Sequence, residues 1–389
     1  MAQSRLNSYT LNFGPHHPST HGVLRLFLEM DGEVVVSCNP EIGYLHRGVE
    51  KLVESRKFLS IIPFLDRLDY LSPLLQEHAF VLALERCIGI SPPRRAVLIR
   101  TIFDELTRIS SHIMALGSAS YEIGALSLFL YGFEEREKIM EIFEETTGAR
   151  MHLSYYVPGG VLGDINEDII SKINAFIDGL GFYFEAVEKL ALNNRIFKKR
   201  TKGIGIITKD FAISSGISGV NLRASGVSYD VRKSNPYGAY ESLQFDQIVL
   251  QDGDCYARNE LRYLEIKQSV DIIRQCLQII EPGEIMNYGC FLESVEQGGL
   301  RELVHAGMFA IGLELPKNTS VYSCVESPRG EFGIHMLTAK DQTKPYRMHF
   351  KSPSFAHIQM LKELVVGSRL ADVTAILGSL DFLIGDCDR

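Results

Sequence analysis

Hydrophobic residues recur along this chain with two different periods. Near the N-terminus, residues 23–30 and 33–37 alternate apolar and polar side chains on either side of Asp31-Gly32. Asp-Gly between two alternating runs is a strong signal for a β-hairpin. Residues 8–13 have the same strand-like character, whereas from Leu45 onward the apolar residues recur at helical spacing. We therefore predict an antiparallel sheet at the N-terminus, followed by a largely helical region.

The remaining pattern predicts the fold class. Helical periodicity recurs near residues 50–61, 64–88, 93–117, 126–146, 166–199, 257–280 and 355–378, and strand character returns at 321–326, 332–339 and 346–350. No internal repeat, low-complexity tract or linker rich in Pro and Ser divides the chain. We predict a mainly α fold of the α+β class. It is expected to form a single domain over 1–389, made of a β-hairpin region (1–44), a helical core (45–290) and a mixed α/β part that closes the core (291–389).

Composition and charge exclude several classes of function. With 389 residues, 46% of them hydrophobic and 23% charged, the chain can bury a sizeable core. The net charge of −8 argues against binding to nucleic acid, which requires a basic face. No apolar run reaches the roughly 20 residues of a membrane helix, and the first ten residues have no features of a signal or transit peptide. We expect the cytoplasm or an equivalent compartment, with association to a membrane-bound partner still open.

The seven cysteines are widely spaced and include no C-x-x-C pair. This pattern favours reduced, mostly buried thiols over a disulfide framework. It also predicts that the chain holds neither an iron–sulfur cluster nor a zinc ribbon of its own, because both require closely paired thiolates. The glycine-rich loops contain no nucleotide-binding motif.

Candidate chemistry begins with the loop at residues 12–22, which contains His16, His17 and His21. Imidazole titrates nearest neutral pH, so clustered loop histidines suggest metal or proton chemistry. Zinc needs three or four converging ligands, and no further His/Cys pair lies close by in the sequence. From this loop alone, zinc binding, proton chemistry and a purely structural role all remain open.

Two further stretches place charged residues in unusual surroundings. Arg47 precedes Gly48, which suits a guanidinium that holds an anionic centre, although Arg47 and Glu50 are also spaced like an ordinary surface ion pair. The segment 64–72 is predicted to be an apolar helix that is interrupted by Asp66, Arg67 and Asp69 beside Tyr70. Buried ionisable residues are either paired or functional, whereas a tyrosine alone is more often a core residue.

One further helical stripe carries three charged residues, Asp104, Arg108 and His112, at i, i+4 and i+8. A solvated helix face is the favoured interpretation of this stripe. Glu122 follows shortly after, among apolar and small residues.

Assembled, these stretches resemble the D subunit of the proton-pumping NADH–quinone oxidoreductase, respiratory complex I. The resemblance extends almost from end to end and includes, in order, NFGPHHPSTHGVLR, LHRGVEKLVESR, FLDRLDYLS, FEEREK, TGARMH, PGGV, SGVNLRASG, SPRGEFG, PYRMHFKSPSF and LADVTAILGSLDF.

That family is related to the large subunit of nickel–iron hydrogenases, so the resemblance implies a multi-helical core of that type. Hydrogenases carry R-x-C-G-x-C where this chain has residues 67–72, and D-P-C-x-x-C where it has residues 381–386. The four nickel-ligating thiolates are replaced here by Asp69, Ser72, Leu383 and Asp386. A nickel–iron centre requires soft thiolates, so hydrogenase chemistry is excluded and no metal site is expected.

The resemblance also implies roles for individual residues. His21 and Tyr70 are expected to hydrogen-bond the two carbonyls of a quinone, and Glu122 to pair with His21 where the family carries an aspartate. Arg47 and His152 match residues that lie beside a [4Fe-4S] cluster held by the adjacent B subunit. The chain itself is expected to bind no cofactor, with quinone as its substrate.

The function implied is that of a quinone-binding core subunit of NADH:quinone oxidoreductase, active only in the complex and coupled to proton translocation. Its expected partners are the B and C subunits of the peripheral arm and the quinone-site subunit of the membrane arm. The expected location is peripheral, on the cytoplasmic side of the bacterial inner membrane or the matrix side in an organelle. The alternatives are a scaffold subunit without its own site and a quinone reductase fed by ferredoxin or F420, while a membrane-bound hydrogenase is a rival that the missing thiolates already disfavour.

Overall fold

The computed structural model describes residues 8–16, 22–287 and 313–389. Its first sheet is antiparallel and contains β1 (Ser8–Phe13), β2 (Arg25–Asp31) and β3 (Val34–Glu41). The predicted Asp31-Gly32 turn joins β2 to β3, and Gly32 has φ of 59°, a backbone angle that glycine adopts without a steric penalty. The predicted N-terminal hairpin is confirmed.

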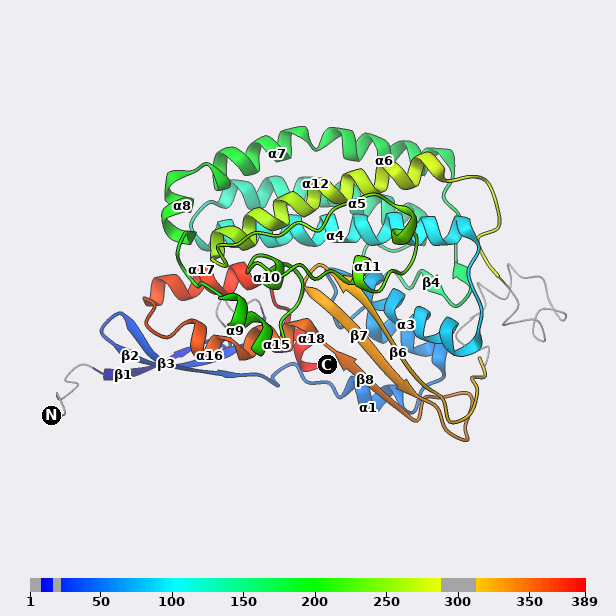
Figure 1. Ribbon diagram of the computed structural model, residues 1–389, viewed down its shortest axis with the longest axis horizontal. Coiled ribbons are helices and arrows are strands. Elements are labelled where there is room, and N and C mark those ends of the chain that lie inside the picture. Colours follow the sequence, from blue (N-terminus) through cyan, green and yellow to red (C-terminus); the bar gives the residue numbers. More distant parts are fainter. Residues whose placement is uncertain (1–7, 17–21, 288–312) are drawn as a thin grey trace.

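Long helices form a layer above the sheets (Figure 1). At its centre, α4 (Arg94–Glu122) packs against α5 (Leu126–Thr147) and α12 (Cys255–Ile279). The outer side is covered by α6 (Glu167–Gly179), α7 (Gly181–Val187), the π-helical turn η3 (Glu188–Leu192) and α8 (Arg195–Thr201). The apolar stripe of α4 is fully buried, so its helical period reports the bundle core.

Short elements connect the sheets to this layer. Those before the bundle are α1 (Val49–Val53), η2 (Phe58–Ile61), α2 (Ile62–Leu65) and α3 (Pro73–Ile88). Those between α5 and α12 are β4 (Tyr156–Val157), β5 (Gly160–Val161), α9 (Lys209–Ser214), α10 (Gly219–Arg223), α11 (Val231–Ser234) and η4 (Tyr240–Ser242).

The C-terminal part is mixed, as predicted. A second antiparallel sheet, packed against α3, is formed by β6 (Ser320–Ser327), β7 (Gly330–Leu337) and β8 (Arg347–Lys351). It is followed by α15 (Pro353–Gln359), α16 (Leu361–Leu364), α17 (Leu370–Leu380) and α18 (Ile384–Asp388). The α+β class with predominantly helical structure is confirmed.

Several helices predicted as continuous are broken. The segment 64–88 becomes a true helix only at Pro73, so Asp66, Asp69 and Tyr70 lie in the preceding turns and not on a helix. Proline fits the first turn of a helix but removes a backbone donor needed further in, which explains this late start. The segment 355–378 is also interrupted, between α16 and α17, where Gly367 has φ of 81°, an angle that glycine adopts without a steric penalty.

The two ends of the described chain share a hydrophobic core. Apolar residues of β2 and β3 pack with those of α15, α16 and α17, apart from the larger core of the bundle. Val35 donates its backbone N–H to the carbonyl of Ser368 at 2.9 Å and accepts one from Gly367 at 2.8 Å. The N-terminal sheet is therefore held by the C-terminal helices. The predicted single domain, with parts divided at residues 44 and 290, stays a prediction.

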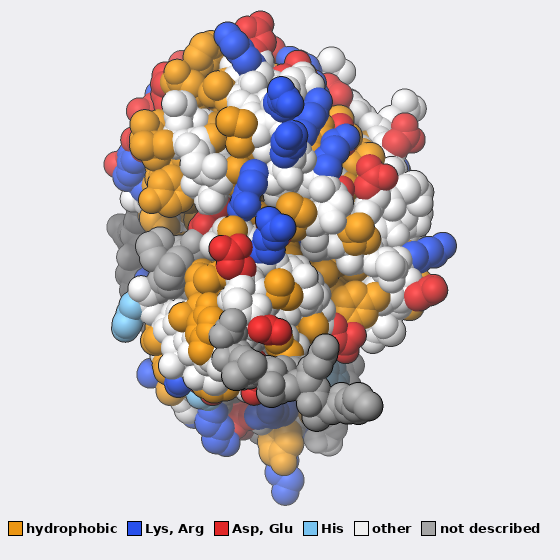
Figure 2. Space-filling model, turned by 90° about the vertical axis from the view of Figure 1, so that its left-hand side faces the viewer, with side chains coloured by type: hydrophobic (Ala, Val, Ile, Leu, Met, Phe, Trp, Pro, Cys, Tyr) orange, Lys and Arg blue, Asp and Glu red, His pale blue; other side chains and the backbone are white. Residues whose placement is uncertain are grey.

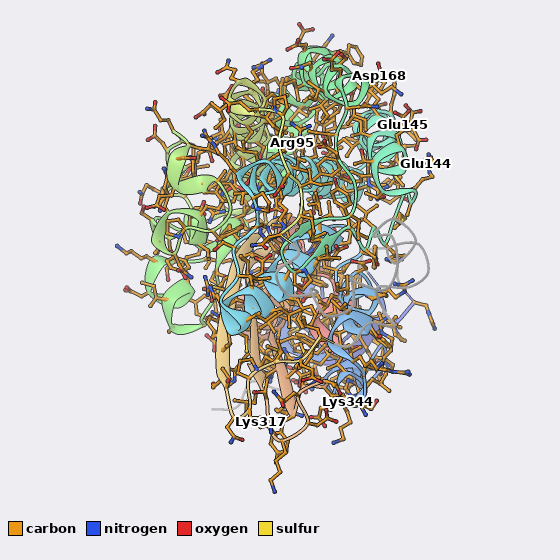
Figure 3. The ribbon with its side chains drawn as sticks, turned by 90° about the vertical axis from the view of Figure 1, so that its right-hand side faces the viewer. Arg95, Glu144, Glu145, Asp168, Lys317 and Lys344 are labelled. Atoms are coloured by element: carbon orange, nitrogen blue, oxygen red, sulfur yellow. The ribbon has the colours of Figure 1, made fainter. Side chains whose placement is uncertain are left out.

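Charged side chains are unevenly placed on the surface. Lysine and arginine side chains gather in a line on the end of the molecule that carries α8, which finishes with Lys198, Lys199 and Arg200 (Figure 2). Acidic residues including Glu144, Glu145 and Asp168 lie on α5 and α6, far from Lys317 and Lys344 in the loops of the second sheet (Figure 3). None of the helices within the described ranges is long and apolar enough to cross a membrane.

Gly219, at the start of α10, packs directly on the turn between β6 and β7. A Cβ added there would overlap with Cα of Gly330, the first residue of β7, and would approach the carbonyl oxygen of Arg329 in that turn. Gly216 provides a matched control, because its φ of 66° resembles the 69° of Gly219 but nothing lies within 4 Å of its added Cβ. Gly216→Ala should cost about 1 kcal/mol of stability through backbone strain alone.

Gly219→Ala should cost at least about 2 kcal/mol more than that, because the overlap involves backbone that cannot move aside. The measurement is the amount of each variant chain recovered in the assembled complex, together with the melting temperature of the purified complex. Equal losses for the two variants would contradict the close packing at Gly219.

Candidate functional site

The turn at residues 66–72, between α2 and α3, is where the structure brings three of the predicted site residues together. The carboxylate of Asp69 organises it by accepting from the backbone N–H of Leu71 at 3.1 Å and of Ser72 at 3.2 Å, and from Ser72 Oγ at 2.5 Å. Such local side-chain bonds stabilise a turn in place of a helix. As a result Asp69 is buried, while the next residue, Tyr70, is 38% exposed.

Arg329, in the turn between β6 and β7, supplies the positive charge at the centre of the site. Its guanidinium donates to Asp69 Oδ2 at 2.7 Å, to Asp381 Oδ1 at 3.4 Å and to Ser111 Oγ at 3.4 Å. Burial opposes the charged form, yet the carboxylates of Asp381, Asp69 and Asp386 raise the pKa of Arg329. Arg329 therefore stays charged and links separate parts of the chain.

A second acidic group approaches from the C-terminal helix. Asp386 on α18 is buried and accepts a hydrogen bond from Ser352 Oγ at 2.6 Å. Burial, and then the negative charge of Asp69, raise its pKa to about 6. The approach requires a glycine at position 385, because a Cβ there would lie 2.8 Å from the carbonyl oxygen of Leu68.

Asp69 and Asp386 act on the same buried guanidinium. Arg329 donates to Asp69 directly, and the negative charges of Asp69 and Asp386 both raise the pKa of Arg329. Within the described ranges, no group of three or more His, Cys, Asp or Glu side chains is arranged to hold a metal ion, and the six cysteines there are free thiols.

The hydroxyl of Tyr70 keeps its proton at neutral pH. Burial is the largest cause that raises the pKa of Tyr70, the charges of Asp69 and Asp381 raise it further, and Arg329 acts in the opposite direction. A protonated phenol at the edge of a buried charged cluster is suited to donate a hydrogen bond to an electron-rich ligand atom.

Arg47 and His152 bind the same turn from another side. Arg47 Nη2 donates to the carbonyl of Arg67 at 2.8 Å, and the Nδ1 atom of His152 lies 3.2 Å from the carbonyl oxygen of Asp66. Although Arg47, Tyr70 and His152 are far apart in the sequence, the three surround one short turn. The structure therefore groups these three predicted site residues.

Glu122 and Gly22 both lie near the C-terminal helices. Glu122 ends α4, and its Cγ would lie 3.3 Å from a Cβ added at Gly378 of α17. His17 and His21 lie outside the described residues, so the structure does not test their predicted roles. The residue after His21, Gly22, lies against α18, because its added Cβ would be 3.2 Å from Cγ1 of Ile384. His16 is exposed.

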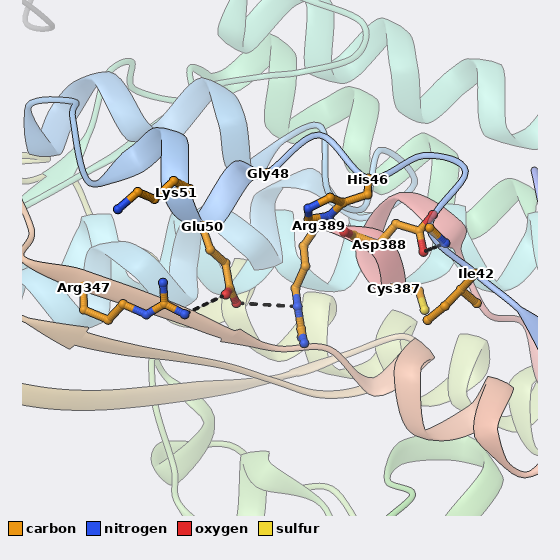
Figure 4. A pocket seen from close by; sticks show the side chains of 10 residues that line it. Ile42, His46, Gly48, Glu50, Lys51, Arg347, Cys387, Asp388 and Arg389 are labelled. Carbon is orange, nitrogen blue, oxygen red and sulfur yellow. Dashed lines mark hydrogen bonds and ion pairs between the residues drawn. The ribbon is translucent and has the colours of Figure 1, made fainter.

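The expected ion pair between Arg47 and Glu50 is wrong. Glu50 instead receives the backbone N–H of Phe350 at 2.9 Å and pairs with Arg347 and Arg389, both at 3.5 Å. These side chains line a pocket of about 410 Å³ that also includes His46 and Asp388 (Figure 4). Glu50 therefore pairs with residues of β8 and of the C-terminal end of the chain, and not with Arg47, which lies one helical turn away in the sequence.

The stripe of Asp104, Arg108 and His112 is also not a solvated face. All three are buried, because α3 and α12 cover this side of α4. Asp104 Oδ2 lies 2.6 Å from Nδ1 of His78, and His112 Nε2 lies 2.9 Å from Oε2 of Glu265. Their spacing marks a helix face correctly but does not show which face is covered.

Comparison with known proteins identifies the family. Residues 122–389 match the family model described as the 49 Kd subunit of respiratory-chain NADH dehydrogenase. The chain belongs to this family, and the resemblance drawn from its motifs is confirmed. Fold and family together define it as a subunit of an oxidoreductase complex.

Relatives that are similar to this chain over nearly their full length are each named as the D subunit of NADH-quinone oxidoreductase. The protein from Rickettsia prowazekii is 44% identical over 385 residues, 98% of each chain. Those from Rhodospirillum rubrum and Paramagnetospirillum magneticum are 43% and 42% identical, with 100% of each chain covered. The chain is accordingly a subunit of the complex I oxidoreductase.

Removing the charge of Arg329 should be strongly destabilising. Arg329→Met leaves the carboxylate of Asp69 buried without a cation and leaves Asp381 with only the more distant Arg262, at 3.9 Å, which costs about 3–5 kcal/mol. Arg150→Met is the control, because its partners Glu137 and Glu144 are exposed and such pairs contribute little. We expect little assembled complex for the first variant and a normal amount for the second, measured by native electrophoresis. Normal assembly of Arg329→Met would contradict the balancing role of the guanidinium.

Asp386 should make stability depend on pH in a defined direction. Its folded-state pKa of about 6 lies above the ordinary 3.8, so its stabilising contribution is complete below pH 3.8 and is lost as the pH rises through 6. Asp386→Asn lacks this loss. Relative to wild type, the melting temperature of the variant complex should therefore rise from pH 5 to pH 8, corresponding to about 1 kcal/mol. An unchanged difference would show that Asp386 is ionised across this range.

Proposed function

We propose that the chain forms a wall of the quinone-reduction site of NADH:quinone oxidoreductase, where quinone receives electrons and protons. The observation that carries the proposal is the turn at residues 66–72. It carries the partly exposed side chain of Tyr70 and binds Arg47 and His152 through the carbonyls of Arg67 and Asp66. The turn therefore carries a possible hydrogen-bond donor to the substrate, and it contacts two groups suited to face an electron source.

Tyr70 and His21 are the groups proposed to bind the two carbonyl oxygens of the quinone. Reduction by two electrons places negative charge on both oxygens, and two protons then complete the quinol. A phenol O–H and an imidazole N–H can each stabilise that charge by a hydrogen bond and then transfer a proton. The burial that raises the pKa of Tyr70 keeps its proton in place until charge develops on the substrate.

Glu122 is proposed to orient His21 and to return its proton. A carboxylate hydrogen-bonded to one ring nitrogen fixes the tautomer of a histidine and stabilises its protonated form. The support from the structure is positional. Glu122 ends α4 against α17, and the residue after His21 lies on α18, which follows α17 after a short connection.

Arg47 and His152 are proposed to face a [4Fe-4S] cluster held by the adjacent B subunit, which supplies the electrons. Among the described residues of this chain, no three or more His, Cys, Asp or Glu side chains are grouped so that they could hold a metal ion. A guanidinium near a cluster raises its reduction potential, and a nearby imidazole can take up a proton when the cluster is reduced.

The partners proposed are the B and C subunits and the quinone-site subunit of the membrane arm. The corresponding place is peripheral, at the cytoplasmic side of the bacterial inner membrane, where quinone reduction is coupled to proton translocation. The support is the naming of full-length relatives as subunits of NADH-quinone oxidoreductase.

The proposal is tested with Tyr70→Phe and His21→Ala in the assembled complex. Removing either proton donor should lower the quinone reductase rate per assembled complex by about 100-fold. Tyr346→Phe is the control, because this tyrosine is 68% exposed and lies outside the site. Near-normal rates with native quinone in both test variants would contradict the proposal. Poor assembly with a normal rate per complex would indicate a scaffold role instead.

A further inference from the structure

Two buried carboxylates, Asp66 and Glu77, lie beside the site but have no part in the chemistry described above. Both side chains are completely inaccessible to solvent. Glu77 Oε2 accepts the backbone N–H groups of Tyr155 and Tyr156, both at 2.8 Å. Asp66 Oδ2 accepts from the N–H of Ser154 at 3.1 Å and from its Oγ at 2.9 Å. Three successive residues of the chain are therefore bound by this pair.

The second oxygen of each carboxylate has no donor. Asp66 Oδ1 and Glu77 Oε1 are both buried without a hydrogen-bond partner among the described residues. Among the described residues, no Lys, Arg or His nitrogen forms an ion pair with Asp66 or Glu77; the nearby His78 and Arg100 pair with other carboxylates. Buried oxygen atoms without partners are uncommon and require an explanation.

The titratable groups on the surrounding elements are bound elsewhere. Arg67 donates to the carbonyl of Pro63. His78 pairs with Asp104, and Arg100 pairs with Glu85. Tyr155 donates to the carbonyl of Gly163, and Tyr156 donates to Asp104. His152 meets Asp66 only at its backbone carbonyl. None of these groups neutralises the pair.

Two buried carboxylates without a cation cannot both ionise, because each charge disfavours the other where burial removes the screening by bulk solvent. We propose that Asp66 and Glu77 share a single proton between Asp66 Oδ1 and Glu77 Oε1, and that the pair so formed positions His152. One proton satisfies both free oxygens and leaves a single negative charge for the four donors of residues 154–156. In agreement, burial and then the charge of Asp66 raise the pKa of Glu77.

The segment held by the pair has a strained backbone. His152 has φ of 58° and Ser154 has φ of 44°, in the left-handed region that residues other than glycine rarely adopt. Such a conformation persists only where surrounding contacts enforce it, and the four hydrogen bonds from Ser154, Tyr155 and Tyr156 to the pair do so here. Asp66 and Glu77 are thus positioning residues. Their link to electron transfer rests on the proposed role of His152 beside the cluster.

The shared proton is tested with amide variants in the assembled complex. In Glu77→Gln the amide oxygen can still accept from Tyr155 and Tyr156, while its NH₂ donates to Asp66 Oδ1. In Asp66→Asn the amide likewise supplies the missing hydrogen to Glu77 Oε1. In the double variant two NH₂ groups face each other. Each single variant should assemble within about twofold of wild type, whereas the double variant should assemble at least about fivefold less.

Glu85→Gln serves as the matched contrast on the same helix. Glu85 is paired with the buried guanidinium of Arg100 at 2.7 Å, so even a single amide there removes a needed charge and should lower assembly. Two results would overturn the shared proton. One is a double variant that assembles as well as the single variants, and the other is single variants that fail as Glu85→Gln does. Neither depends on whether the chain reduces quinone.

The dependence of activity on pH separates positioning from mere packing. In wild type, alkaline pH removes the shared proton, leaves two adjacent charges and loosens the segment that carries His152. In Glu77→Gln the hydrogen cannot be lost. The rate of Glu77→Gln should therefore persist to a pH about one unit higher than that of wild type. Identical alkaline limits in the two complexes would overturn the positioning role.

Discussion

The guanidinium of Arg329 lies where water is excluded, so its charge must be balanced by carboxylates that the fold brings to it. Asp69 comes from the turn before α3, Asp381 from the end of α17, and Asp386 from α18. The turn and the two C-terminal helices lie far apart in the sequence. Because an unbalanced buried charge is costly, this cluster connects the second sheet, the bundle and the C-terminal helices. The position of Tyr70, and hence the proposed substrate contact, depends on it.

The same principle operates along the interior of the bundle. Arg223 joins Glu265 and Glu326, Arg232 joins Asp230 and Glu105, and His112 meets Glu265, all of them buried. Such pairs contribute less to stability than hydrophobic packing of equal size would, but each has few acceptable arrangements. Their effect in this chain is to fix how α4, α12 and the connecting loops lie relative to one another. A rigid frame of this kind suits a site that must meet groups from neighbouring subunits.

Polar pairing also gives the site its internal charge balance. The buried carboxylates of Asp69 and Asp381 need a cation, and Arg329 supplies it from within the chain. The Asp66–Glu77 pair solves a related problem with a proton in place of a guanidinium. Asp69 in the first arrangement and Asp66 in the second both belong to the turn at residues 66–72.

The sequence by itself determined the fold class, the N-terminal hairpin and the long helices α4, α5 and α12, because hydrophobic period and turn residues are local properties. Its motifs also determined the family, and with it the candidate residues Tyr70, Arg47 and His152. Three features were decided only by the tertiary structure: the burial of the Asp104 stripe, the true partners of Glu50, and the meeting of Arg329 with Asp69 and Asp381. Helical spacing shows which residues share a face, but which element covers that face depends on contacts between residues hundreds of positions apart.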